Sequence, residues 1–77
     1  MKNNIYLITP SKKGEELISY DCYTGFVVIA KNEEQARELC PFADEGNIWI
    51  SHKLSKCKKI GESNKKIQVI LSSFNAG

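Results

Sequence analysis

The stretch Tyr20–Leu39 decides the fold and reads Tyr-Asp-Cys-Tyr-Thr-Gly-Phe-Val-Val-Ile-Ala-Lys-Asn-Glu-Glu-Gln-Ala-Arg-Glu-Leu. Within it, Phe26–Ala30 is a short apolar run rich in β-branched residues, which is typical of a strand buried on both faces. Asn32 is a suitable helix N-cap, and the carboxylates of Glu33 and Glu34 suit the positive end of the helix dipole. The stretch therefore predicts a strand that leads directly into a helix.

The predicted helix spans Glu33–Cys40 and ends at Pro41, because proline cannot continue a helix. Ala36, Leu39 and Cys40 recur at helical spacing and predict one apolar stripe that faces the core. The other side chains are expected on the outer, solvent-facing side of the helix: Glu33, Glu34, Arg37 and Glu38.

Strands are also predicted around this helix, at Asn4–Thr9, at Lys56–Gly61 and at Ile67–Phe74. Gly25, inside the strand of residues 20–30, predicts a bulge or a close backbone approach. The first two strands are expected to pair antiparallel across the intervening loop. The order β-β-α-β-β predicts an α+β fold, a small antiparallel sheet with one helix packed on one face. Because the other face is left partly open, we expect a homo-oligomer.

The length of 77 residues, without repeats or linkers, predicts one small α+β domain over residues 1–77. Cys22, Cys40 and Cys57 are odd in number and far apart, so we expect reduced thiols of a cytoplasmic protein. No apolar run reaches membrane-spanning length, and no apolar signal core follows the N-terminus, so no membrane association is expected.

The charges divide the chain into a basic start, an acidic middle and a basic end, although the net charge is only +2. Residues 15–45 carry eight acidic side chains against two basic ones, and residues 46–77 carry six lysines against one glutamate. A basic patch can attract phosphates or an acidic protein. It is equally typical of a solvated loop and a lysine-rich edge strand, and charge alone does not separate these interpretations.

No motif in the sequence dictates a catalytic chemistry. His52 is the single histidine, and no cysteine is placed at a helix N-terminus where its thiol would be activated. The cysteines and carboxylates show no metal-ligand spacing, and no glycine-rich loop precedes the helix. We therefore expect a protein that is not an enzyme and has no metal site and no cofactor.

A set of aromatic, polar and cationic residues predicts a binding site instead. Aromatic rings beside cations and amides suit a nucleobase and its phosphate, and the same residue types also anchor protein interfaces. Each of them also has a structural interpretation, because a single tryptophan in a small domain is more often part of the core. The candidate ligand-binding residues are Tyr20, Asp21, Tyr23, Arg37, Trp49, Ser73 and Asn75.

One resemblance covers nearly the whole chain, from about residue 5 to residue 77. Its elements are Tyr20-Asp21, Val27-Val28-x-Ala30, Glu34-x-Ala36-Arg37, Pro41, Trp49, Ile60-Gly61-Glu62 and the terminal Ser73-Phe74-Asn75-Ala76-Gly77. In this combination the chain resembles a family of very short bacteriophage and prophage proteins, and the terminal pentapeptide is the most specific part. The family often has histidine before the proline that ends the helix, whereas this chain has Cys40.

The resemblance implies a setting, the cytoplasm of a phage host, where small proteins without catalytic groups act by binding. The leading hypothesis is sequestration of a nucleotide-type immune signalling molecule. Tyr20, Tyr23 or Trp49 would stack on it, Arg37 or lysines would contact phosphate, and Ser73 or Asn75 would donate hydrogen bonds. Direct inhibition of a host defence protein is the first alternative, and nucleic-acid binding is a less favoured one.

Overall fold

The computed structural model describes residues 2–18 and 21–75. The chain forms β1 (Asn3–Pro10), the one-turn helix α1 (Lys12–Glu15), β2 (Cys22–Ala30), α2 (Glu33–Leu39), the 3₁₀ helix η1 (Asn47–Trp49), β3 (Ser55–Ser63) and β4 (Gln68–Asn75). This is the predicted small α+β fold, and the strand boundaries differ from the predicted ones by a few residues at most. The helical turn α1, however, lies in the segment that was expected to be only a loop between the first two strands.

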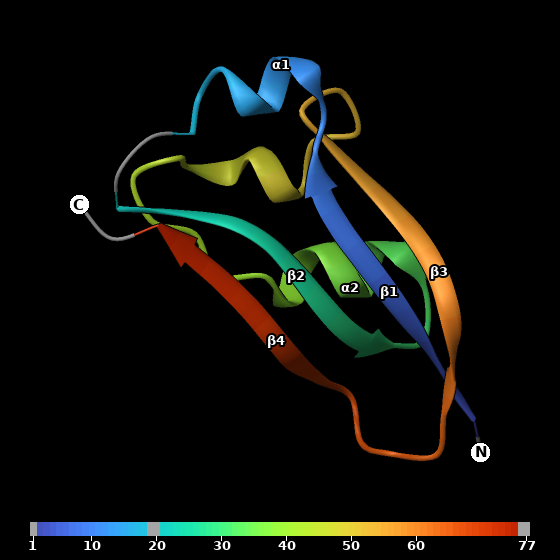
Figure 1. Cartoon of the computed structure of the whole chain (residues 1–77). Coiled ribbons are helices and arrows are strands. Elements are labelled where there is room, and N and C mark those ends of the chain that lie inside the picture. Colours follow the sequence, from blue (N-terminus) through green and yellow to red (C-terminus); the bar gives the residue numbers. More distant parts are fainter. Residues whose placement is uncertain (1, 19–20, 76–77) are drawn as a thin grey trace.

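The four strands form one antiparallel sheet in the order β3-β1-β2-β4 (Figure 1). β1 and β2 pair antiparallel, as predicted, with Tyr6 opposite Val28 and Ile8 opposite Phe26, and this pair lies at the centre of the sheet. β3 and β4 follow each other in the chain but lie at opposite edges of the sheet. The connection between them therefore crosses the end of the sheet, at the bottom of Figure 1.

The core lies between one face of the sheet and the layer formed by α2 and η1 (Figure 1). Because side chains alternate along a strand, every second residue of β1 and β2 points into it. The sheet contributes Tyr6, Ile8, Phe26, Val28 and Ala30, and the helical layer contributes Ala36, Cys40, Ile48 and Trp49. Ile29 is also buried, so the predicted burial of Phe26–Ala30 on both faces is largely confirmed, with Val27 only half-buried.

The prediction for the exposed face of α2 is wrong at two positions. Arg37, expected in solvent, is only 3% exposed, whereas Leu39, expected in the apolar stripe, is 37% exposed. Ala36 and Cys40 are buried as predicted. Arg37 lies in the core because polar groups of other elements accept its hydrogen bonds there. Helical periodicity alone does not show that such partners exist.

Three irregularities bend the sheet. The ladder between β2 and β4 shifts register between Tyr23 and Gly25, which confirms the bulge predicted near Gly25. It shifts again at Val27 and Val28, where Ile70 is the extra residue of β4. On the other edge, Ile60 is the extra residue of β3 where that strand pairs with β1. Each edge strand thus carries one bulged isoleucine with an exposed side chain.

The N-cap of α2 provides a first testable prediction. Asn32 Oδ1 accepts a hydrogen bond of 2.8 Å from the Gln35 N–H, and Gln35 Oε1 accepts one of 2.8 Å from the Lys31 N–H. We expect Asn32→Ala to lower the free energy of unfolding by about 1 kcal/mol, because it removes this acceptor. Asn32→Asp keeps an acceptor and should be nearly neutral. Urea titrations of both variants compare the two, and equal losses would contradict the capping role.

Candidate functional site

Arg37, which the sequence placed at the ligand, is the centre of a buried polar cluster. Its Nη1 donates to the carbonyl oxygen of Trp49 at 3.0 Å and to the Ser55 hydroxyl at 2.6 Å. The same nitrogen donates to the Ser51 carbonyl oxygen at 3.2 Å, and Nε donates to Glu33 Oε2 at 2.9 Å. The guanidinium therefore joins α2 to the end of η1 and the start of β3. It is not free to contact a phosphate.

Trp49, which was expected to stack on a ligand, is 1% exposed. Its indole N–H donates to Glu45 Oε2 at 2.7 Å, and its ring meets Phe26 edge-on at a centroid distance of 5.1 Å. Glu45 Oε1 also accepts the backbone N–H groups of Tyr23 and Ala43. A buried carboxylate with three donors fixes the loop before η1, so Trp49 has a structural role and offers no open ring face.

Of the remaining predicted site residues, the structure describes the side chains of Asp21, Tyr23 and Ser73, and each has its own local contacts. Tyr20 and the side chain of Asn75 lie outside the described residues. Asp21 precedes β2 with a left-handed backbone (φ 59°), and its carbonyl accepts the Asp44 N–H. Tyr23 is half-buried and packs edge-on against Phe74, with ring centroids 4.9 Å apart. Ser73 is exposed, and its hydroxyl accepts a hydrogen bond of 2.6 Å from Thr24 Oγ1.

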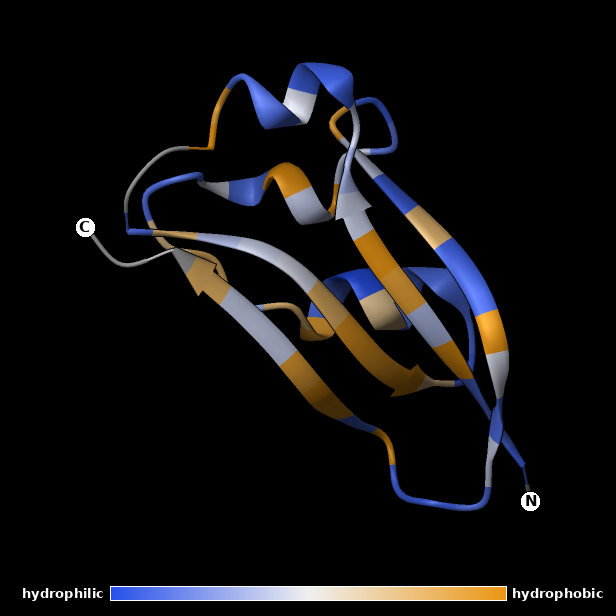
Figure 2. Ribbon diagram, in the orientation of Figure 1, coloured by the Kyte–Doolittle hydropathy of each residue, from blue (hydrophilic) through white to orange (hydrophobic). Residues whose placement is uncertain are grey.

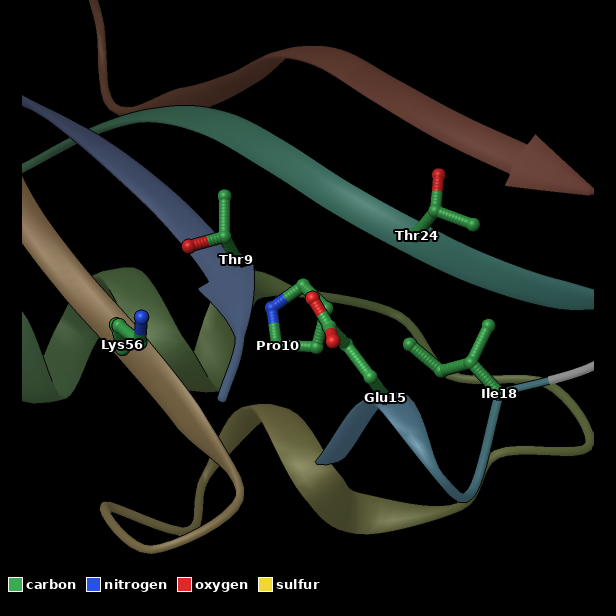
Figure 3. Close-up of a pocket in the computed structure, with 6 residues that line it drawn as sticks. All are labelled: Thr9, Pro10, Glu15, Ile18, Thr24 and Lys56. Carbon is green, nitrogen blue, oxygen red and sulfur yellow. The ribbon is translucent and has the colours of Figure 1, made fainter. Parts of the chain in front are cut away.

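A pocket of about 480 Å³ opens at the end of the sheet beside α1, and we call it the α1 pocket (Figure 3). It is lined by Thr9, Pro10, Glu15, Ile18, Thr24 and Lys56. Figure 3 shows the two threonines on the neighbouring strands β1 and β2, with Glu15 and Ile18 coming from α1 and the segment after it. Its volume is within the range of small-molecule sites, and it combines both charge signs with hydroxyl and apolar groups.

The position of α1 in this pocket depends on a close backbone contact. Ser11 caps the helix, since its hydroxyl accepts the Gly14 N–H and donates to the Lys53 carbonyl oxygen at 2.7 Å. A Cβ atom on Gly14 would collide with the carbonyl oxygen of Leu54. Glycine is therefore required at this position, and it holds Glu15, the next residue, against the pocket.

A second, smaller pocket of about 150 Å³ lies next to the first on the sheet face opposite α2, and we call it the apolar pocket. Its lining is Leu7, Gly25, Phe26, Val27, Leu71 and Ser73. The Thr24–Ser73 hydrogen bond joins the two pockets, because Thr24 lines one and Ser73 the other. Ser73 is thus the predicted site residue that the structure brings to this face.

Sequence reasoning missed four polar residues of the α1 pocket: Thr9, Glu15, Thr24 and Lys56. Lys56 is one of the six lysines in the basic last part of the chain. The charge distribution therefore indicated this region, but it did not distinguish Lys56 from the other lysines. No feature of the sequence indicated a binding role for Glu15, because a helical turn was not predicted there. The two threonines come together only through strand pairing, since they lie in different strands.

Cys40 and Cys57 are not activated as nucleophiles. Burial raises the pKa of Cys40 to about 12, with a smaller contribution from the negative charge of a Cys57 thiolate. Burial also raises the pKa of Cys57 to about 11, with Glu33 adding to the shift. Arg37 opposes both shifts without cancelling them. Thiols with raised pKa values are poor nucleophiles at neutral pH.

These shifts predict how stability depends on pH. An unfolded cysteine loses its proton near pH 8.5, whereas the folded thiols keep theirs to about pH 11 or 12. The folded state therefore binds more protons in this window, so stability should be full below about pH 8.5 and should fall as pH rises further. Urea titrations across this range test the prediction. The double variant Cys40→Ala, Cys57→Ala should show a weaker pH dependence, and an unchanged one would contradict it.

Within residues 2–18 and 21–75, no group of three or more histidine, cysteine, aspartate or glutamate side chains could hold a metal ion. In the same part of the chain, none of the helices has the length and apolar character needed to span a bilayer. Comparison with protein-family models, with curated proteins and with solved structures gives no match for this chain.

Proposed function

We propose that this chain is a small non-enzymatic binding protein that sequesters a nucleotide-type molecule in the α1 pocket. The setting is the one implied by the sequence resemblance, in which a phage protein removes an immune signalling molecule from the host cytoplasm. The observation that carries the proposal is the composition of the pocket, where Lys56, Glu15 and two threonines surround an apolar wall.

The two charged groups of the pocket support the proposal because neither is paired with another group of the described residues. Among the described residues, neither the Glu15 carboxylate nor the Lys56 ammonium has a hydrogen-bond or ion-pair partner. An ammonium group suits a phosphate, and a carboxylate suits the hydroxyls of a ribose. Pro10 and Ile18 supply an apolar surface for the face of a base. One ligand with phosphate, sugar and base would use all three parts of the pocket.

The test is a thermal-shift screen of the purified protein against cyclic dinucleotides, ADP-ribose derivatives and mononucleotides. A ligand that binds only the folded state raises the midpoint of unfolding in proportion to the logarithm of its concentration. We expect one compound class to do so. Lys56→Gln should weaken its binding at least about tenfold, since a charge-assisted contact to phosphate is lost.

The chain offers matched controls for both charged residues. Lys58→Gln makes the same change two residues along β3, outside the pocket, and Glu16→Gln is the matching control for Glu15→Gln, which removes the carboxylate of the pocket. Both controls should bind as the wild type does. The proposal is contradicted if no compound stabilises a folded sample, or if Lys56→Gln and Lys58→Gln weaken binding equally. The first result would favour direct binding of a host defence protein.

A further inference from the structure

The two edge strands of the sheet differ in charge. β3 carries four lysine or glutamate side chains near its free edge, Lys56, Lys58, Lys59 and Glu62, all of them exposed. β4 carries no charged residue over its whole length, Gln68–Asn75. Lysines on an edge strand discourage pairing with another chain, whereas an uncharged edge strand of eight residues permits it. Only one edge of this sheet is therefore protected by charge.

The unprotected edge is also apolar (Figure 2). Ile70, Leu71 and Phe74 of β4 are 52%, 61% and 46% exposed. Figure 2 shows hydrophobic colours over much of β4 and blue bands along β3. Among the described strands, none pairs with the outer side of β4, so its outward N–H and C=O groups are available to another strand. An apolar, uncharged, unpaired edge is the usual template for strand addition.

We infer that β4 pairs antiparallel with β4 of a second copy, which joins two sheets into one of eight strands. Self-pairing about a two-fold axis closes after two subunits, because the same edge serves both. It places no charge opposite a like charge, and it partly covers Ile70, Leu71 and Phe74 of each copy with uncharged cross-strand neighbours from the other. A small domain with a thin core gains most from covering such side chains.

The charge pattern favours a second copy over a different protein or over open-ended assembly. β4 has no charge with which to select a partner of opposite charge, so a self-complementary neutral strand is the simplest match. Pairing of β4 with β3 of another copy would lead to fibres, and it would bring the lysines of β3 against an apolar edge. Those lysines therefore act against the open-ended arrangement.

The two bulged isoleucines provide a matched test. Ile70 on β4 and Ile60 on β3 are 52% and 50% exposed, and each is the extra residue at a bulge of an edge strand. Analytical ultracentrifugation over a series of protein concentrations measures the dimer dissociation constant of the wild type, Ile70→Lys and Ile60→Lys. We expect a wild-type dimer, at least about tenfold weaker association for Ile70→Lys, and no change for Ile60→Lys.

Each other result would overturn the inference. A wild-type protein that stays monomeric into the millimolar range has no β4 self-association. A dimer that survives Ile70→Lys, or is weakened equally by both variants, has its interface elsewhere. Higher, open-ended oligomers would indicate β4 pairing with β3. Circular dichroism of each variant confirms that it is folded. The thermal-shift screen with nucleotides gives an independent result, because Ile70 does not line the α1 pocket and its substitution should leave ligand binding there unchanged.

Discussion

Replacing Arg37 by methionine is expected to lower the free energy of unfolding by about 3–5 kcal/mol, because a buried charged network loses its central member. The guanidinium satisfies the Trp49 carbonyl and the Ser55 hydroxyl, and methionine of similar length offers no donor to either. A chain of this size has a total stability of about 4–12 kcal/mol, so the variant should lose a large share of it. Urea titration followed by circular dichroism measures the loss.

Two variants of the same helix show whether the loss comes from the network. Arg37→Lys keeps the charge but not the planar fork, so it should recover only a small part of the stability. Glu38→Gln, next in sequence and exposed, should change the free energy of unfolding by less than about 0.5 kcal/mol. If Arg37→Met costs no more than Glu38→Gln, Arg37 does not hold the fold together.

Replacing Trp49 by alanine is expected to lower the free energy of unfolding by about 3–5 kcal/mol. Trp49 is the largest fully buried side chain, and its removal leaves a cavity beside Phe26. It also leaves Glu45 Oε2 without the indole donor. Circular dichroism is the measurement here, since the variant lacks the tryptophan that fluorescence would report.

A more conservative change separates the two parts of this loss. Trp49→Phe keeps most of the ring and removes the N–H, so it should cost about 1–3 kcal/mol through the unsatisfied carboxylate. Ile50→Ala, at the 53% exposed neighbouring position, should cost less than about 1 kcal/mol. If Trp49→Ala resembles Ile50→Ala, Trp49 is not the centre of the core.

The centre of the fold could be predicted because its signals are local. Asn32 as N-cap, Pro41 as helix stop and the apolar run Phe26–Ala30 each act on neighbouring residues, and the structure confirms all three. The order β3-β1-β2-β4 could not be predicted, because strand pairing depends on contacts far apart in the sequence. The turn α1 was missed because it is held by Leu54, a distant residue.

The roles of individual side chains were harder to predict than the fold. Arg37 lies among acidic neighbours on the helix, which indicated a solvated face. The groups that bury it, from Trp49 and Ser55, lie 12 and 18 residues away in the chain. The α1 pocket has the same difficulty, since Thr9, Thr24 and Lys56 come from three strands. Residue types predicted binding chemistry, but only the fold shows which of them reach one surface.

The location of binding is tested most directly by an NMR titration of ¹⁵N-labelled protein with the compound that stabilises it. The proposed function predicts that backbone amides around the α1 pocket shift most, those of Thr9, Thr24 and Lys56 among them. The amides of α2, which packs on the core face of the sheet, should shift least. Largest shifts at α2, around Arg37, would contradict the α1 pocket as the binding site.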